Sequence, residues 1–229
     1  MKRRTLDFVF SAGGVGVAVL LLILGLVMTS NATFAKSYVR NQLREQQITF
    51  KPVNTLTAEE KKAACVVKYA GQELTTGKQA ECYANQFIGL HLKSIPGASG
   101  QTYAQLGDTQ TQLKAQIALA QKANSPSVAG LQQRLTDVTS ARTTVFQGET
   151  LRGLLLTSYG FSVLGAKGGQ VATVAYLVAG LMLLLSIAGF AHALRTPGTE
   201  AVAVPDRPKA RRRPLRARRV EQERTPAGV

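Results

Sequence analysis

Two long apolar runs dominate the pattern of this chain: residues 8–28 near its start and residues 171–193 near its end. Neither run contains Asp, Glu, Lys or Arg. Each is long enough to cross a bilayer, because about 20 apolar helical residues span about 30 Å of hydrocarbon. The pattern predicts a mainly α-helical membrane protein, with two transmembrane helices that flank a domain of residues 29–170.

A cleaved secretory signal peptide is the competing interpretation of the first run. The small residues Ser30-Asn31-Ala32 resemble a cleavage site. The apolar part of a signal is usually about 7 to 15 residues long, however, and this run is longer. We therefore expect a retained anchor. Under both interpretations the intervening domain has crossed the membrane.

Small residues spaced four apart mark one face of each run. Residues of this kind let a second helix approach closely, so we expect the two spans to pack on each other or on a partner. The pairs are Ala12 with Gly16, Gly14 with Ala18, and Ala175 with Ala179.

The first predicted helix continues beyond its apolar run. Phe34, Tyr38 and Leu43 recur at helical spacing in a polar background, so the helix extends about three turns outward. Residues 48–57 have no helical period, and they predict a loop with a short extended piece.

Two capping boxes mark the starts of the next helices. In a capping box, a Thr side chain and a later Glu or Gln satisfy each other's free backbone N–H groups. The boxes are Thr57 with Glu60 and Thr76 with Gln79, and they predict helices at 58–68 and 77–93, the second ended by residues 94–100.

A helical hairpin is predicted farther along the chain. Apolar residues at helical spacing run through residues 103–123 and again through 128–145. Ser125 and Pro126 would form the turn, as the N-cap and the first residue of the second helix. The apolar seam is like that of a coiled coil but short, so an antiparallel pair in a small bundle is expected.

Residues 151–165 are nearly as apolar as the spans, but the segment is too short for a separate crossing. We expect Lys167-Gly168-Gly169 to break the helix, and 151–165 to form a helix that lies at the outer membrane surface or enters it obliquely. Arg152, Tyr159 and Lys167 would then lie near the lipid headgroups. The alternative is a core helix of the external domain.

Basic residues fix the expected orientation of this chain, whose net charge is +15. Lys2, Arg3 and Arg4 precede the first span, and an arginine-rich tail follows the second. By the positive-inside rule, residues 1–7 and the tail lie in the cytoplasm. The domain between the spans then lies outside, and the protein belongs to the cell membrane.

The tail, residues 194–229, has several prolines and no hydrophobic periodicity, so we expect it to be disordered. A basic residue near anionic lipid contributes about 1 kcal/mol of attraction. We expect the tail to contact anionic lipid of the inner leaflet. An acidic protein partner is the alternative, and nucleic acid is not expected. The clustered residues are Arg211, Arg212, Arg213, Arg216, Arg218 and Arg219.

The two cysteines, Cys65 and Cys82, fall on the two helices predicted after the loop. In an oxidising compartment an even pair is more often a disulfide, with two buried free thiols as the alternative. A metal site is not predicted, because only His91 lies nearby and four ligands cannot be assembled there.

Four short segments carry a resemblance to a known group: residues 74–81 (LTTGKQAE), 83–92 (YANQFIGLHL), 102–105 (TYAQ) and 148–156 (GETLRGLLL). Through them, most of residues 1–195 resembles a family of functionally uncharacterised actinobacterial two-span membrane proteins. Some members are labelled aromatic ring-opening dioxygenase, which would imply an enzyme.

The histidines do not fit that activity. A non-haem iron oxygenase commonly uses two histidines and a carboxylate at one metal, whereas His91 and His192 are predicted on opposite sides of the membrane. No GxSxG motif occurs either. We therefore expect no cofactor and no enzymatic activity.

The remaining function classes are binding functions. We expect a scaffold or accessory subunit of the cell envelope, whose external helical domain contacts another membrane or envelope protein. The alternative is a membrane-bound sensor or regulatory module that signals through a partner.

Overall fold

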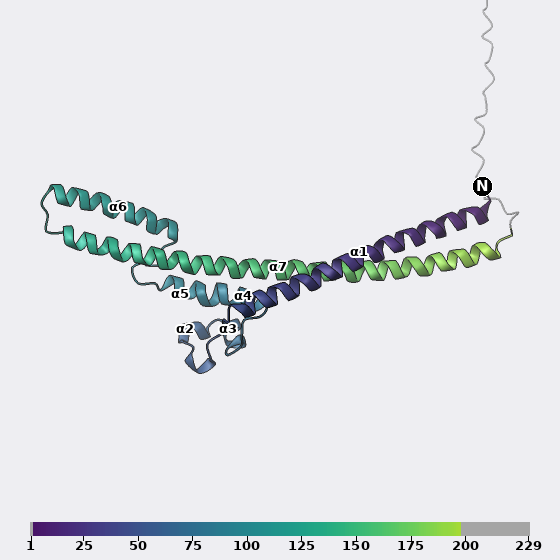
Figure 1. The fold of residues 1–229 in the computed structure, drawn as a ribbon, viewed down its shortest axis with the longest axis horizontal. Coiled ribbons are helices and arrows are strands. Elements are labelled where there is room, and N and C mark those ends of the chain that lie inside the picture. Colours follow the sequence, from purple (N-terminus) through teal and green to yellow (C-terminus); the bar gives the residue numbers. More distant parts are fainter. Residues whose placement is uncertain (1, 198–229) are drawn as a thin grey trace, which may run out of the picture.

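The computed structural model describes residues 2–197, in which two long helices lie side by side over much of their length (Figure 1). Helix α1 comprises Arg3–Glu45 and helix α7 comprises Val128–Arg195. Both are long and apolar enough to cross a membrane. The predicted mainly helical fold and its two long apolar helices are confirmed.

Helices α1 and α7 are antiparallel and approach closely at small residues. Gly25 of α1 faces the ring of Tyr176, and a Cβ atom at Gly25 would lie 2.5 Å from a ring carbon. The Tyr176 hydroxyl also lies 3.1 Å from Thr29 Oγ1. Only glycine therefore fits at position 25 without a shift of the ring.

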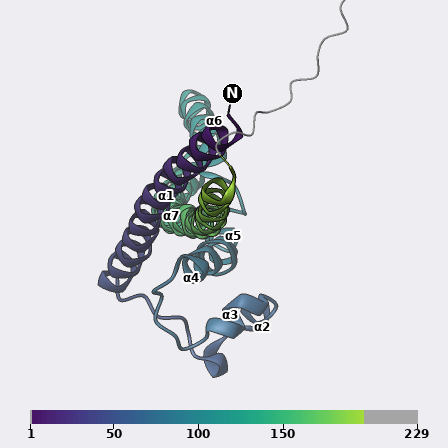
Figure 2. The same cartoon turned by 90° about the vertical axis from the view of Figure 1, so that its right-hand side faces the viewer.

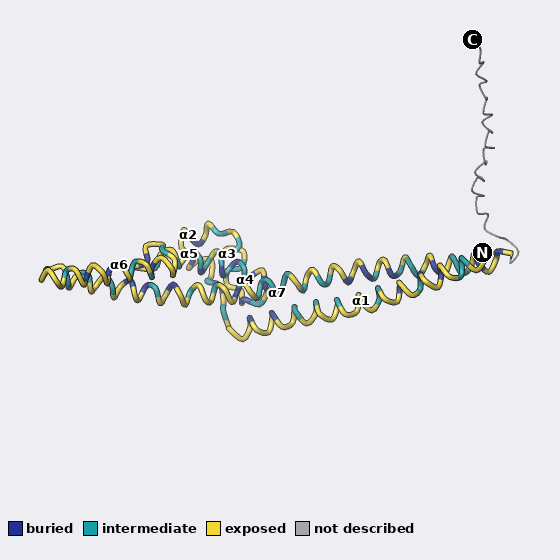
Figure 3. Tube along the Cα trace, turned by 90° about the horizontal axis from the view of Figure 1, so that it is seen from above, coloured by how far each residue is buried: buried dark blue, intermediate teal, exposed yellow. Residues whose placement is uncertain are grey.

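The predicted small-residue faces have different surroundings in this pair. Gly14 and Ala18 are buried, and so are Ala175 and Ala179. Ala12 and Gly16 are exposed, as is much of α1, whose trace is largely coloured as exposed in Figure 3. The α1–α7 contact therefore uses one of the two small-residue pairs predicted to form the face of the first apolar run.

Helix α7 continues without interruption through the tripeptide at 167–169. The predicted break there was wrong. A Cβ atom on Gly168 or Gly169 would lie 3.8–3.9 Å from Cβ of Ala32 in α1, so both glycines pack against α1. Glycine disfavours a helix by only about 1 kcal/mol, which such packing can offset. Residues 151–165 are thus part of the same helix as the second apolar run.

A compact domain of short helices lies against the middle of α7, with α2 and α3 farthest from it (Figure 2). Both predicted capping boxes are formed. The predicted helix 58–68 is interrupted at residues 62–63, whereas 77–93 is continuous but contains a π-helical segment. The elements are η1 (Val53–Thr55), α2 (Ala58–Lys61), α3 (Ala64–Tyr69), α4 (Gly77–Cys82), η2 (Tyr83–Ile88) and α5 (Gly89–Lys93).

The core of this domain joins it to both long helices. Phe50, Val66 and Leu74 are buried together with Leu43 of α1 and Leu155 of α7. The extended piece predicted near residue 49 is an isolated antiparallel bridge between Thr49 and Glu73. Because Leu155 belongs to the apolar segment 151–165, one face of that segment forms part of the core of the domain.

Helix α6 (Tyr103–Lys122) folds back along the outer part of α7 and forms the predicted hairpin (Figure 1). A second apolar cluster holds the pair together, with Leu106, Leu113, Val138 and Val145 at its centre. The start of α7 was predicted two residues early: Ser127 is its N-cap residue.

Candidate functional site

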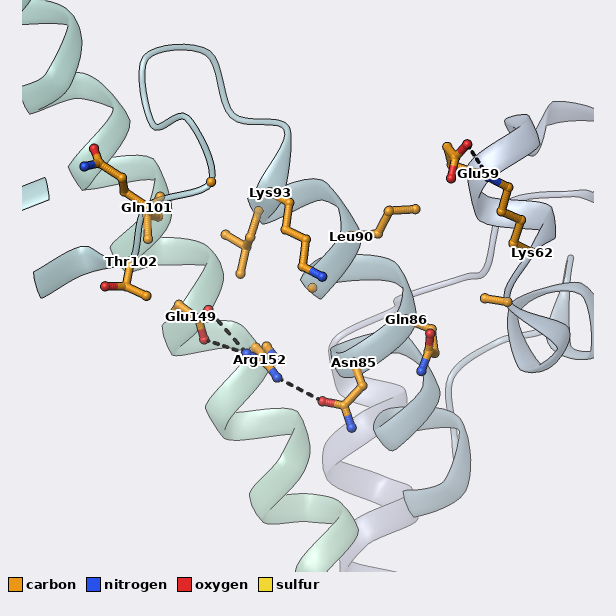
Figure 4. A pocket seen from close by; sticks show the side chains of 15 residues that line it. Glu59, Lys62, Asn85, Gln86, Leu90, Lys93, Gln101, Thr102, Glu149 and Arg152 are labelled. Atoms are coloured by element: carbon orange, nitrogen blue, oxygen red, sulfur yellow. Dashed lines mark hydrogen bonds and ion pairs between the residues drawn. The ribbon is translucent and has the colours of Figure 1, made fainter. Parts of the chain in front are cut away.

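A polar cleft of about 450 Å³ lies between α7, the η2–α5 segment and the loop that leads into α6 (Figure 4). Its volume falls in the range of small-molecule sites. The compact domain supplies one wall and α7 the other, so the cleft exists only because the domain packs on that helix. Its charged side chains are Glu59, Lys62, Lys93, Glu149 and Arg152.

Arg152 of α7 fixes one wall of the cleft. Its Nη1 donates to the Glu149 carboxylate at 3.2 Å, and its Nη2 donates to Asn85 Oδ1 at 3.2 Å (Figure 4). Its Nε is buried and has no hydrogen-bond partner among residues 2–197. The guanidinium thus ties η2 to α7.

Lys93 supplies a cation without a counter-ion. Lys62 pairs with Glu59 at 2.6 Å, whereas Lys93 makes no ion pair with a described residue. Its side chain extends toward the Arg152 side of the cleft (Figure 4). This arrangement can neutralise and hydrogen-bond an anionic or polar group.

Metal-ligating residues are not clustered: residues 2–197 hold no group of three His, Cys, Asp or Glu side chains that could bind a metal ion. The lining of the cleft contains no Ser, Cys or His. The chemistry that these side chains offer is therefore hydrogen bonding and charge pairing.

Glu60 is a fully buried charge beside the cleft. One of its oxygens accepts from Lys51 Nζ at 2.8 Å and lies 3.2 Å from His91 Nε2. The other accepts from the backbone N–H of Thr57 at 2.7 Å. The hydrogen bond from Lys51 and those from Thr57 lower the pKa of Glu60 to about 2, although burial alone would raise it.

The two histidines lie at separate places in the fold. His91 is on α5, with Nε2 toward Glu60 and Nδ1 2.7 Å from the carbonyl oxygen of Phe87. His192 is near the end of α7, where Nε2 lies 3.9 Å from Asp7 of α1. Each histidine has its own acidic neighbour, and the fold does not bring the two together.

Cys65 of α3 and Cys82 of α4 are joined by a disulfide, as predicted, with a Cα–Cα distance of 6.0 Å. The bond links the α2–α3 layer to the helix that packs on α7. It therefore holds the element that carries Glu59 and Lys62 against the rest of the cleft.

The residues predicted at the membrane surface lie along one helix. Lys167 is exposed, and Tyr159 accepts a hydrogen bond from Lys78 Nζ at 3.3 Å. Arg152 lines the cleft instead of standing free. Contact of these side chains with lipid stays a prediction. The six predicted tail arginines, from Arg211 to Arg219, lie outside residues 2–197.

The capping box predicts the local role of Glu60, but it does not predict the partners of the Glu60 carboxylate. The capping box is a local signal, whereas Lys51 and His91 reach Glu60 from separate segments. No spacing rule connects Asn85 with Arg152, which are 67 residues apart. Comparison with family models, with curated proteins and with solved structures finds no match for this chain.

Proposed function

We propose that this protein is a non-enzymatic integral membrane protein of the cell envelope, with two spans and cytoplasmic termini. Its helical domain lies outside and docks another membrane or envelope protein, as a scaffold or accessory subunit. Basic residues before the first span and after the second support this orientation. The disulfide supports an oxidising compartment for the domain.

The continuity of α7 carries the proposal. The helix runs from the hairpin tip at Val128, past the compact domain, to Arg195 at the end of the apolar run. At 1.5 Å per residue, the part that precedes residue 171 is about 65 Å long. A single helix of this length holds a docking surface at a fixed height above the membrane.

An apolar groove of about 320 Å³ between α1 and α7 is the surface we assign to the partner. It is lined by Tyr38 of α1 and by Leu151, Leu154 and Phe161 of α7. All four side chains are exposed, and all four lie outside the two apolar runs. Large exposed apolar patches on a protein surface mark interaction sites. Because the groove continues along the same helices as the spans, a helix of another membrane protein can reach it.

The test uses the full chain, isolated from its native membrane in mild detergent. A photoreactive amino acid at position 154 is compared with one at Leu119 of α6, which is equally exposed but far from the groove. We expect one membrane protein to cross-link in stoichiometric amount at position 154 only, and to be lost in Leu151→Glu/Phe161→Glu. A chain that stays alone, or a complex that these substitutions leave intact, contradicts the proposal.

The polar cleft favours a sensor or regulatory module as the second candidate. It combines an unpaired lysine with a side chain network that spans the compact domain and α7. A ligand bound there would change the contact between domain and helix. In that case the complex with the partner depends on an added ligand, whereas a scaffold holds its partner constitutively.

A further inference from the structure

A third cavity, of about 470 Å³, is lined by residues of α1, of α7 and of the start of α4, at the outer end of the apolar runs. It shares no lining residue with the polar cleft, and it adjoins the apolar groove, with which it shares Val39. On α1 it is lined by residues 32–40, and on α7 by residues 162–169.

The inner end of this cavity lies at the height of a layer of lipid headgroups. At 1.5 Å per residue, Gly169 and Ser162 lie about 3 and about 14 Å outside the apolar run that starts at residue 171. The headgroup layer of a bilayer begins at the edge of the hydrocarbon and is about 5–8 Å thick. Lys36 and Arg40 line the farther part of the cavity, and their long side chains can reach down toward phosphates.

The charge of this cavity has a single sign. Lys36 and Arg40, one turn apart on α1, are the only charged residues among residues 2–197 that line it. Both are exposed, and neither makes a hydrogen bond or ion pair with another residue of the described chain. Thr33 and Ser162 add hydroxyl groups. The lining of the polar cleft, by contrast, mixes the carboxylates of Glu59 and Glu149 with its basic side chains.

The floor of the cavity is made of small apolar residues. Ala166 and Gly169 of α7 line it, and a Cβ atom at Gly169 would have only Ala32 at 3.8 Å as its neighbour. Below it, the apolar seam between α1 and α7 continues toward Gly25 and Tyr176. A ligand with an anionic head and an apolar body therefore fits both the basic upper part of the cavity and the apolar seam below it.

We propose that this cavity binds the phosphate headgroup of an anionic phospholipid from the leaflet nearest the helical domain. Lys36 and Arg40 pair with the phosphate, the hydroxyls of Thr33 and Ser162 hydrogen-bond the headgroup, and the acyl chains follow the apolar seam. This inference rests on the membrane topology of the proposed function but not on the partner.

The test reconstitutes the full chain into phosphatidylcholine vesicles that contain increasing fractions of photoactivatable phosphatidylglycerol. Labelled peptides are identified by mass spectrometry, so labelling of residues 32–40 and 162–169 is measured separately from that of the basic tail. Lys36→Ala/Arg40→Ala removes the charge, and Ala166→Leu fills the cavity without changing charge. Lys114→Ala/Lys122→Ala, on α6, is the matched control.

We expect the charge variant to need about thirtyfold more phosphatidylglycerol for half-maximal labelling of these peptides. Each basic residue near anionic lipid contributes about 1 kcal/mol, and 1.4 kcal/mol is tenfold. Ala166→Leu should reduce the labelling, whereas the α6 control and the labelling of the tail should not change.

The proposal is overturned if labelling of both peptides is unaffected by the charge variant and by Ala166→Leu, or if a phosphatidylcholine probe labels them equally. Displacement of the label by millimolar inorganic phosphate would identify a site for free phosphate instead. A second lipid probe, with its photoactivatable group in the acyl chains, tests independently whether the two spans lie in the membrane. Labelling of the spans without labelling of the cavity peptides refutes the lipid site alone. Absence of labelling on the spans refutes the membrane topology of the proposed function.

Discussion

Replacing Glu60 by glutamine tests whether a buried carboxylate holds the compact domain together. The substitution keeps the size of the side chain but removes the charge that Lys51 pairs with, 2.8 Å away. Glu59 is the matched control, because it is the neighbouring residue and pairs with Lys62 at 2.6 Å, but its side chain is 62 % exposed.

The expected magnitude follows from the ionisation of Glu60. Its pKa is lowered from 4.5 to about 2, which corresponds to about 3 kcal/mol in favour of the ionised form at 1.36 kcal/mol per pH unit. We expect Glu60→Gln to lower the free energy of unfolding of the domain by about 2 to 3 kcal/mol. Glu59→Gln should cost at most about 0.5 kcal/mol, because exposed ion pairs contribute little.

The same reasoning fixes the dependence on pH. A carboxyl group whose pKa is lower in the folded state stabilises the fold above its unfolded pKa. That contribution is lost as the pH falls from about 4.5 through about 2. The difference in stability between the wild-type chain and Glu60→Gln should therefore shrink across that window.

The measurement is hydrogen exchange in mild detergent at neutral pH, read on residues 58–69 and 77–93. Thermal unfolding followed by circular dichroism between pH 2 and pH 5 then gives the pH dependence. Equal exchange in Glu60→Gln and Glu59→Gln would show that the buried charge does not stabilise the domain, as would a constant difference in stability across the pH window.

Three further predictions concern the other contacts. Cys65→Ser/Cys82→Ser should lower the free energy of unfolding by about 3 kcal/mol, because the disulfide closes a loop with a sequence separation of 17. A thiol titration of the denatured, unreduced wild-type chain should find no reactive thiol. Gly25→Val should lower the thermal stability by about 1 to 3 kcal/mol through its clash with Tyr176, while Gly13→Val, which meets no atom within 4 Å, should be neutral; equal effects would contradict the packing of α1 on α7. Arg152→Ala should destabilise the domain by about 1 to 3 kcal/mol, because it leaves Asn85 and Glu149 without their hydrogen-bond partner. Arg134→Ala, on the exposed face of the same helix, should not destabilise it. The two variants are compared by hydrogen exchange of residues 83–93.

Local patterns in the sequence determined the helices and their starts. The apolar runs 8–28 and 171–193 require long helices whatever the rest of the chain does, because a run of that length has few other ways to satisfy its backbone in an apolar medium. The capping boxes at Thr57 and Thr76 act within four residues, so the tertiary structure left them unchanged.

Tertiary contacts decided where α7 is continuous and what its faces touch. Lys167-Gly168-Gly169 is a weak helix signal by itself, but packing of both glycines on Ala32 of α1 holds the helix together. The apolar character of 151–165 likewise could not distinguish a membrane surface from a protein core. Burial of Leu155 beside Phe50 and Leu74 answers that question for one face of the helix.

The sites depend still more on the tertiary structure. The polar cleft, the buried charge at Glu60 and the basic cavity at Lys36 each combine residues from segments far apart in the chain. Hydrogen bonds and charge pairs act over a few ångströms in space, and sequence spacing predicts such proximity only within one helix or turn. The sequence by itself thus determined the long helices and the cysteine pair, whereas only the packing of α1 and of the compact domain on α7 created surfaces that can bind a partner or a ligand.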